Sequence, residues 1–142
     1  MISNTYANKI LNHLCGRSES LGQPEALYLG LCSEEPTATD GTVTGQPDAP
    51  SYARVIVGGR NYTNHFDGAD QGKITNSKEI QFKTARTAWG HMKYFFLSTS
   101  ATGNAIMWGE INNGNGVTIG DETVPTFYEG ELTISLDVPL AE

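Results

Sequence analysis

Apolar residues alternate with polar or small ones in several short runs along this chain. Strict alternation with a period of two predicts half-buried β-strands, because successive strand side chains point to opposite faces. Gly and Asn turns separate the runs about every ten residues, which is typical of an antiparallel β-sandwich or a partly closed barrel. The predicted strands are Ala26–Cys32, Tyr52–Val57, Glu79–Phe82, Trp89–Ser98, Ala105–Ile111, Val117–Ile119, Thr123–Phe127 and Glu131–Asp137.

The most apolar pair of runs, Trp89–Ser98 and Ala105–Ile111, is joined by a tight turn at residues 101–104. Tyr94 and Phe96 should point to one face, and Phe95 and Leu97 to the other. A strand that is apolar on both faces needs a cover on each. We expect a second sheet, a helix or another subunit to provide it.

The chain begins with a different period. Tyr6, Ile10 and Leu14, with Ala7 and Leu11, recur at spacings of three and four, which predicts an amphipathic helix over about residues 5–15. Ser3 or Asn4 can cap its start, and Gly16 can end it. An isolated helix of this length is marginal in water, so its apolar stripe needs a partner. That partner is either the chain's own sheet or a neighbouring subunit.

A long loop over about residues 33–50 is rich in Thr, Gly, Pro and acidic residues and has no periodicity. A loop of that length within a compact domain is usually either functional or disordered, and the sequence favours neither. With 142 residues, the chain is expected to form one domain over 1–142. The predicted fold class is mainly β: an antiparallel, jelly-roll-like β-sandwich with one short N-terminal amphipathic helix.

Charge and composition narrow the possible partners. The formal net charge of -7 and the pI near 4.8 argue against nucleic acid, which needs clustered Lys and Arg. No apolar run is long enough for a membrane span, and the start lacks the pattern of a secretory signal, so we expect synthesis in the cytoplasm and no membrane partner. Cys15 and Cys32 are expected to be buried thiols, and the sequence leaves open whether they pair.

Candidate chemistry is sparse. His13, His65 and His91 have no metal-ligand spacing, no Gly-x-Ser-x-Gly run occurs, and neither cysteine has a suitably placed base. We therefore expect no enzyme activity, catalytic residue, metal or cofactor. Trp89 and Trp108 could serve as core residues or as a platform for sugar rings, and core or subunit packing is the favoured interpretation.

The order of short motifs carries a resemblance over nearly the whole chain. The motifs are Leu-Asn-His-Leu-Cys-Gly at 11–16, Ala-Leu-Tyr-Leu-Gly-Leu-Cys-Ser-Glu-Glu-Pro-Thr at 26–37, Tyr-Ala-Arg-Val at 52–55, Ile-Gln-Phe-Lys-Thr-Ala at 80–85, Trp-Gly-His-Met-Lys-Tyr-Phe at 89–95, Asn-Ala-Ile-Met-Trp-Gly at 104–109 and Leu-Thr-Ile-Ser-Leu at 132–136. In this order they resemble the small structural proteins of tailed bacteriophages and prophages that are labelled tail-fibre proteins.

The resemblance implies a β-sandwich building block of the virion, made in the host bacterial cytoplasm and assembled as a homo-oligomer, with a trimer favoured. Its partners would be other copies and other virion structural proteins. The implied position is on the tail, as a tail-fibre or baseplate component that serves assembly and attachment. Two alternatives remain: a head-decorating or head-fibre protein of the capsid, and a receptor-recognition module that binds host surface glycan.

The residues expected at subunit contacts come from two places. The helix stripe contributes Tyr6, Ile10 and Leu14, and the Tyr-Ala-Arg-Val motif contributes Tyr52 and Arg54. For Arg54 we expect a structural role, in which it pairs with a carboxylate at a seam.

Overall fold

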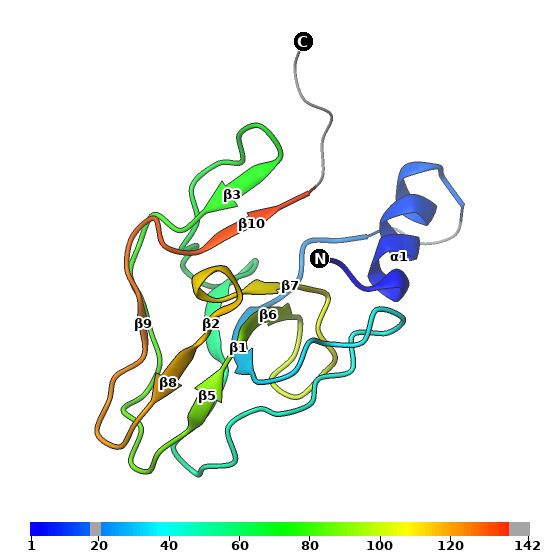
Figure 1. Cartoon of the computed structure of the whole chain (residues 1–142). Coiled ribbons are helices and arrows are strands. Elements are labelled where there is room, and N and C mark those ends of the chain that lie inside the picture. The colour runs from blue at the N-terminus through cyan, green and yellow to red at the C-terminus, as the bar shows by residue number, and fades with distance from the viewer. Residues whose placement is uncertain (18–20, 137–142) are drawn as a thin grey trace.

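The computed structural model describes residues 1–17 and 21–136, which form one N-terminal helix and a set of short antiparallel strands (Figure 1). The mainly β, antiparallel fold class with one N-terminal helix is confirmed. The elements are α1 (Asn4–Leu14), β1 (Leu27–Cys32), β2 (Val55–Gly58), β3 (Lys73–Thr75), β4 (Ile80–Gln81), β5 (Gly90–Met92), β6 (Tyr94–Ser98), β7 (Met107–Glu110), the 3-10 turn η1 (Asn112–Gly114), β8 (Val117–Ile119), β9 (Thr126–Phe127) and β10 (Thr133–Ser135).

One four-stranded antiparallel sheet organises the domain, with strand order β2-β1-β6-β7. The predicted aromatic hairpin is its centre: β6 pairs with β7 so that Phe96 lies opposite Trp108, and with β1 so that Phe95 lies opposite Leu31. The single predicted strand Trp89–Ser98 is wrong, however, because the chain changes partners at Lys93. The Lys93 N–H donates to the carbonyl of Cys32 and its carbonyl accepts from Ile111, whereas β5 pairs with β8 in the other layer.

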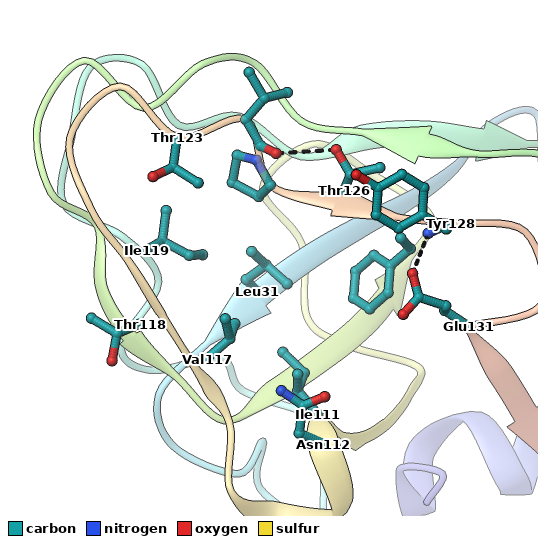
Figure 2. A pocket seen from close by; sticks show the side chains of 13 residues that line it. Leu31, Ile111, Asn112, Val117, Thr118, Ile119, Thr123, Thr126, Tyr128 and Glu131 are labelled. Atoms are coloured by element: carbon teal, nitrogen blue, oxygen red, sulfur yellow. Dashed lines mark hydrogen bonds between the residues drawn. The ribbon is translucent and has the colours of Figure 1, made fainter.

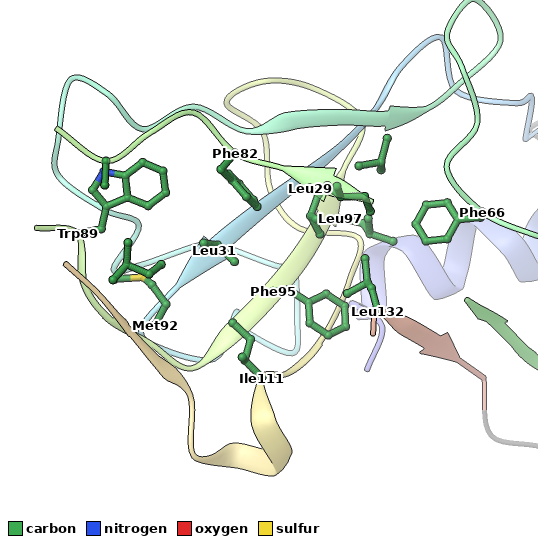
Figure 3. Close-up of a cluster of buried hydrophobic side chains, with 14 residues drawn as sticks. Leu29, Leu31, Phe66, Phe82, Trp89, Met92, Phe95, Leu97, Ile111 and Leu132 are labelled. Atoms are coloured by element: carbon green, nitrogen blue, oxygen red, sulfur yellow. The ribbon is translucent and has the colours of Figure 1, made fainter. Parts of the chain in front are cut away.

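Three two-stranded antiparallel ribbons, β3–β10, β4–β9 and β5–β8, form that other layer. They pack against one face of the four-stranded sheet and bury the large core between the layers, which gives a sandwich-like arrangement (Figure 3). The sheet contributes Leu29, Leu31, Phe95 and Leu97, and the opposite layer contributes Phe66, Ile80, Phe82, Trp89, Met92, Ile119 and Leu132.

The other face of the sheet is covered by the long loop. A smaller core there contains Cys32, Phe96, Ala105 and Trp108, with Val43 of the loop packed against it. The carbonyl of Gly41 accepts from the N–H of Ala105 at 2.8 Å. Gly41 has φ +77°, and a Cβ there would overlap the carbonyl oxygen of Ala105. The predicted two-sided burial of β6 is thus confirmed, and much of loop 33–50 is a cover for the sheet.

Several predicted strand ends are wrong. Strand β2 begins only at Val55, because the Tyr52 N–H closes a turn with the carbonyl of Ala49. Tyr52 therefore packs with the large core and does not share a face with Arg54 in a strand. Strand β9 begins at Thr126, after Pro125, which has no N–H to donate to a ladder. Strand β10 is also shorter than predicted, and residue 137 of that prediction lies outside the described residues.

The predicted N-terminal helix is confirmed over Asn4–Leu14. The Ser3 hydroxyl accepts from the N–H of Tyr6, which caps the first turn. Gly16, with φ +70°, ends the helix, and the N–H groups of Gly16 and Arg17 bond back to His13 and Asn12 as in a Schellman motif. Cys15 at this end is exposed, so the prediction of a buried thiol is wrong there and right for Cys32, and both thiols are free.

Two glycines next to β6 make room for its aromatic rings. Gly30 of β1 lies opposite Phe96, and Gly109 of β7 lies opposite Phe95. A Cβ at Gly30 would overlap the ring of Phe96, and one at Gly109 would lie 2.6 Å from Cζ of Phe95. Phe95 and Phe96 thus lie over neighbouring strands only because those strands carry glycine there.

We expect Gly30→Ala to lower the free energy of unfolding by about 1–3 kcal/mol, because Phe96 is fully buried and must shift within a packed core. Urea denaturation measures the change. Gly68→Ala is the matched control, since a Cβ at Gly68 meets nothing within 4 Å. A Gly30→Ala variant as stable as the control would contradict this packing.

Candidate functional site

Helix α1 is attached to the sheet by the residues that precede it. Ile2 forms an antiparallel bridge with Met107, the Ser3 N–H donates to the carbonyl of Ile106, and the Thr5 N–H donates to the carbonyl of Thr39. These backbone bonds fix the start of the helix near β7. From there α1 lies to one side of the sandwich, away from the ribbons (Figure 1).

The apolar stripe of α1 is left largely uncovered. No residue of the helix is buried: Tyr6 and Ile10 are half-buried, whereas Leu11 is 56% exposed and Leu14 is 76% exposed. The sequence allowed two covers for this stripe, the chain's own sheet or a neighbouring subunit. In this structure the sheet does not cover Leu11 and Leu14. Tyr6, Ile10 and Leu14 therefore lie together on an accessible helix, whereas Tyr52 and Arg54 lie elsewhere.

Arg54 fastens the loop and the β6–β7 turn to the sheet. Its Nε donates to Oε1 of Gln46 at 3.1 Å. Its Nη1 lies 2.8 Å from Oγ of Ser98, 3.0 Å from the carbonyl oxygen of Ser100 and 2.8 Å from that of Gly103. One guanidinium thus joins β2 and the long loop to the end of β6 and the β6–β7 turn.

The same guanidinium stacks over the ring of Phe96, with Cζ 4.7 Å from the ring centroid, a cation–π geometry. Burial lowers the pKa of Arg54, but an arginine keeps its charge. Among the residues that the structure describes, Arg54 has no carboxylate partner; the ion pair found there joins Arg86 to Glu122. Pairing of Arg54 at a seam between subunits stays a prediction.

Tyr52 completes this cluster from the core side. Its hydroxyl donates to Oε1 of Gln46 at 2.9 Å and accepts from the N–H of Leu31 at 3.1 Å. Burial raises the pKa of Tyr52 to about 12, so the phenol stays neutral and can donate. The polar groups of Tyr52 and Arg54 therefore serve packing within the subunit, and their predicted subunit contact is untested.

A groove that the sequence did not reveal lies between β8 and β9, with a volume of about 310 Å³. Leu31 and Ile111 lie between Val117–Ile119 on one side and Thr126–Tyr128 on the other (Figure 2). Glu131 lies at one end, where its Oε1 accepts from the N–H of Tyr128 at 2.8 Å. Both strands were predicted, but only the fold shows that they splay apart above Leu31 and Ile111, which are 2% and 7% exposed.

Among the described residues, no group of His, Cys, Asp and Glu could hold a metal ion. Burial raises the pKa of Cys32 to about 12, so this thiol is not a nucleophile near neutral pH. Trp89 and Trp108 are each 4% exposed, which leaves neither indole free to stack on a sugar. Within residues 1–17 and 21–136, no helix has the length and hydrophobicity that a membrane span needs.

Comparison with known families decides the identity of the chain. A family described as Podophage GP4 fiber I protein gp80 matches residues 1–135, nearly the whole sequence. The chain belongs to this fiber I protein family. It is therefore a fibre-type structural protein of a bacteriophage virion, which agrees with the resemblance found in its motifs. A search of curated proteins found no match.

For this fiber I family member we expect Arg54→Lys to lower the free energy of unfolding by about 1–3 kcal/mol. A lysine ammonium cannot reproduce the fork that reaches Gln46, Ser98 and Gly103 together. Urea denaturation measures the loss, and Arg60→Lys, at an exposed position, is the control. Equal stability of the two variants would contradict the fastening role of Arg54.

Proposed function

We propose that this fibre protein is a component of the phage tail, in a tail fibre or the baseplate, and acts there as an assembly and attachment building block. Copies associate through the apolar stripe of α1, in the first place as a homotrimer. The observation that carries the proposal is the exposure of Leu11 and Leu14 on a helix that the domain holds in place but does not cover.

The physical argument starts from the helix itself. Eleven residues are too few for a stable helix in water, and full burial of one leucine side chain contributes about 1.5–3 kcal/mol. Covering the stripe of one copy with that of the next would stabilise the helix and would also bury its exposed leucine side chains. Symmetric repetition of one patch is also how most homo-oligomers form.

The tail position is supported by the resemblance to tail-fibre proteins, and the family description supports a fibre role without naming the tail or the head. No described feature favours a capsid position. A glycan-binding role would need exposed aromatic rings; because Trp89 and Trp108 are buried, it would depend on Tyr62 or Tyr128, which are 47% and 61% exposed.

Light scattering after size exclusion tests the assembly role. We expect the wild-type chain of 15.3 kDa to elute as an oligomer, and the double variant Leu11→Gln/Leu14→Gln to elute as a monomer. Glutamine keeps the helix propensity of leucine while removing its apolar surface. We expect the two changes to weaken association roughly tenfold or more.

Asn12→Gln is the control, because it introduces the same residue into the same helix at an exposed polar position. Circular dichroism should show that Asn12→Gln keeps the helix content of the wild type, and that the double variant loses at most the signal of the eleven-residue α1. A wild-type chain that stays monomeric, or a double variant that remains fully oligomeric, would overturn association through α1.

A further inference from the structure

The layer of ribbons is interrupted at the groove. Strand β8 pairs only with β5, and β9 pairs only with β4, among the residues that the structure describes. Both strands line the groove, and residues 120–125 connect them at one end. The second layer of the sandwich thus has a gap between two free strand edges (Figure 2).

The ladders show which backbone groups face this gap. The carbonyl of Ile119 accepts from the N–H of Trp89, and the carbonyl of Pro125 accepts from the N–H of Phe82. The backbone groups of Ile119 and Pro125 therefore point to the paired edges of the two ribbons. Successive residues of a strand direct their N–H and C=O groups to opposite edges. Thr118 and Thr126 therefore present theirs to the gap, and both line the groove.

Side chains alternate across the gap in a matching way. Ile119, Leu31 and Ile111 make a buried apolar floor, Phe127 packs against the large core, and Val117, on the same face of β8 as Ile119, is 38% exposed. The side chains of Thr118 and Thr126 belong to the opposite, outer face of the layer. An extended chain in the gap would place every second side chain on the apolar floor and the others toward solvent.

The two free edges carry no charged side chain. Proteins usually limit pairing at exposed edges with charges, bulges, proline, very short strands or a covering segment. Strands β8 and β9 are short, and Pro125 precedes β9, but their residues, Val117–Ile119 and Thr126–Phe127, are strand-forming and uncharged. A pair of uncharged edges that border one cavity can receive a short strand.

Charge decides what kind of chain would fit. Residues 94–136 contain no Lys, Arg or His and five acidic residues, Glu110, Asp121, Glu122, Glu129 and Glu131. Glu131 is the charged residue of the groove lining, and one of its carboxylate oxygens is bonded to the Tyr128 N–H. Outside this stretch, Arg86 pairs with Glu122 and His91 contacts Thr118, so the charge within the groove lining is that of Glu131, which favours a basic occupant.

We propose that the groove between β8 and β9 binds an extended basic segment of a neighbouring virion polypeptide, which adds to the layer as a β-strand. Three residues of such a segment span about 10 Å, in keeping with the three residues of β8. The inserted strand joins β4–β9 to β8–β5 and closes the sandwich. This goes beyond the proposed function, since it needs no contact at α1, which lies away from the groove in Figure 1.

Peptide binding to the full-length chain tests the proposal. The probe is a fluorescently labelled peptide, acetyl-Lys-Val-Thr-Val-Thr-Lys-amide, measured by anisotropy. We expect it to bind, and to slow the hydrogen exchange of the Thr118 and Thr126 amides. Methylation of its central backbone nitrogens should weaken binding roughly tenfold or more, because strand addition depends on those N–H groups.

Charge and site are tested separately. We expect Glu131→Gln, which keeps an acceptor for the Tyr128 N–H, to weaken binding roughly two- to fivefold, while Glu129→Gln, with the same charge change outside the groove lining, has no such effect. The peptide with glutamate in place of lysine should bind more weakly than the lysine form.

Absence of binding by the lysine peptide, or equal binding of its N-methylated form, would overturn strand addition. Binding that leaves Thr118 and Thr126 unprotected would overturn the site. The double variant Leu11→Gln/Leu14→Gln should bind the peptide as wild type does, so failure of assembly through α1 and failure of strand addition can be told apart.

Discussion

The burial of β6 on both of its faces is the constraint on which the rest of the domain depends. Phe95 and Leu97 enter the large core, and Phe96 lies in the smaller core on the other side. Each face therefore needs a cover, and the chain supplies two different ones. Short ribbons cover the first face, and a loop held by Arg54 covers the second. The strands beside β6 carry Gly30 and Gly109 so that both rings fit.

This arrangement leaves two surfaces unfinished. The loop and the ribbons use their apolar residues inside the subunit, but the stripe of α1 remains exposed and the ribbon layer opens between β8 and β9. A fibre protein of a virion functions by contacts with its neighbours, and these surfaces are where the structure lacks contacts of its own.

Local physical rules predicted most of the elements. Alternation located the centres of the strands, and Ser3 and Gly16 bounded the helix, because these signals act over a few residues. Features that depend on distant partners were missed. The break at Lys93 arises because β5 and β6 belong to different layers, and Arg54 bonds to Ser98, Ser100 and Gly103, which no spacing in the sequence relates to it. The groove arises from the separation of two strands, of which β8 was predicted with its observed bounds and β9 with a start three residues too early.

The central claim is that the function of this chain lies in contacts made by the surfaces that its own fold leaves open. An electron-microscopy map of the assembled phage particle tests that claim most directly, because it shows what covers each surface. We expect density from a neighbouring polypeptide over Leu11 and Leu14, which are exposed in the isolated subunit. A map in which these leucines face solvent, while another part of the domain carries the subunit contacts, would contradict the account.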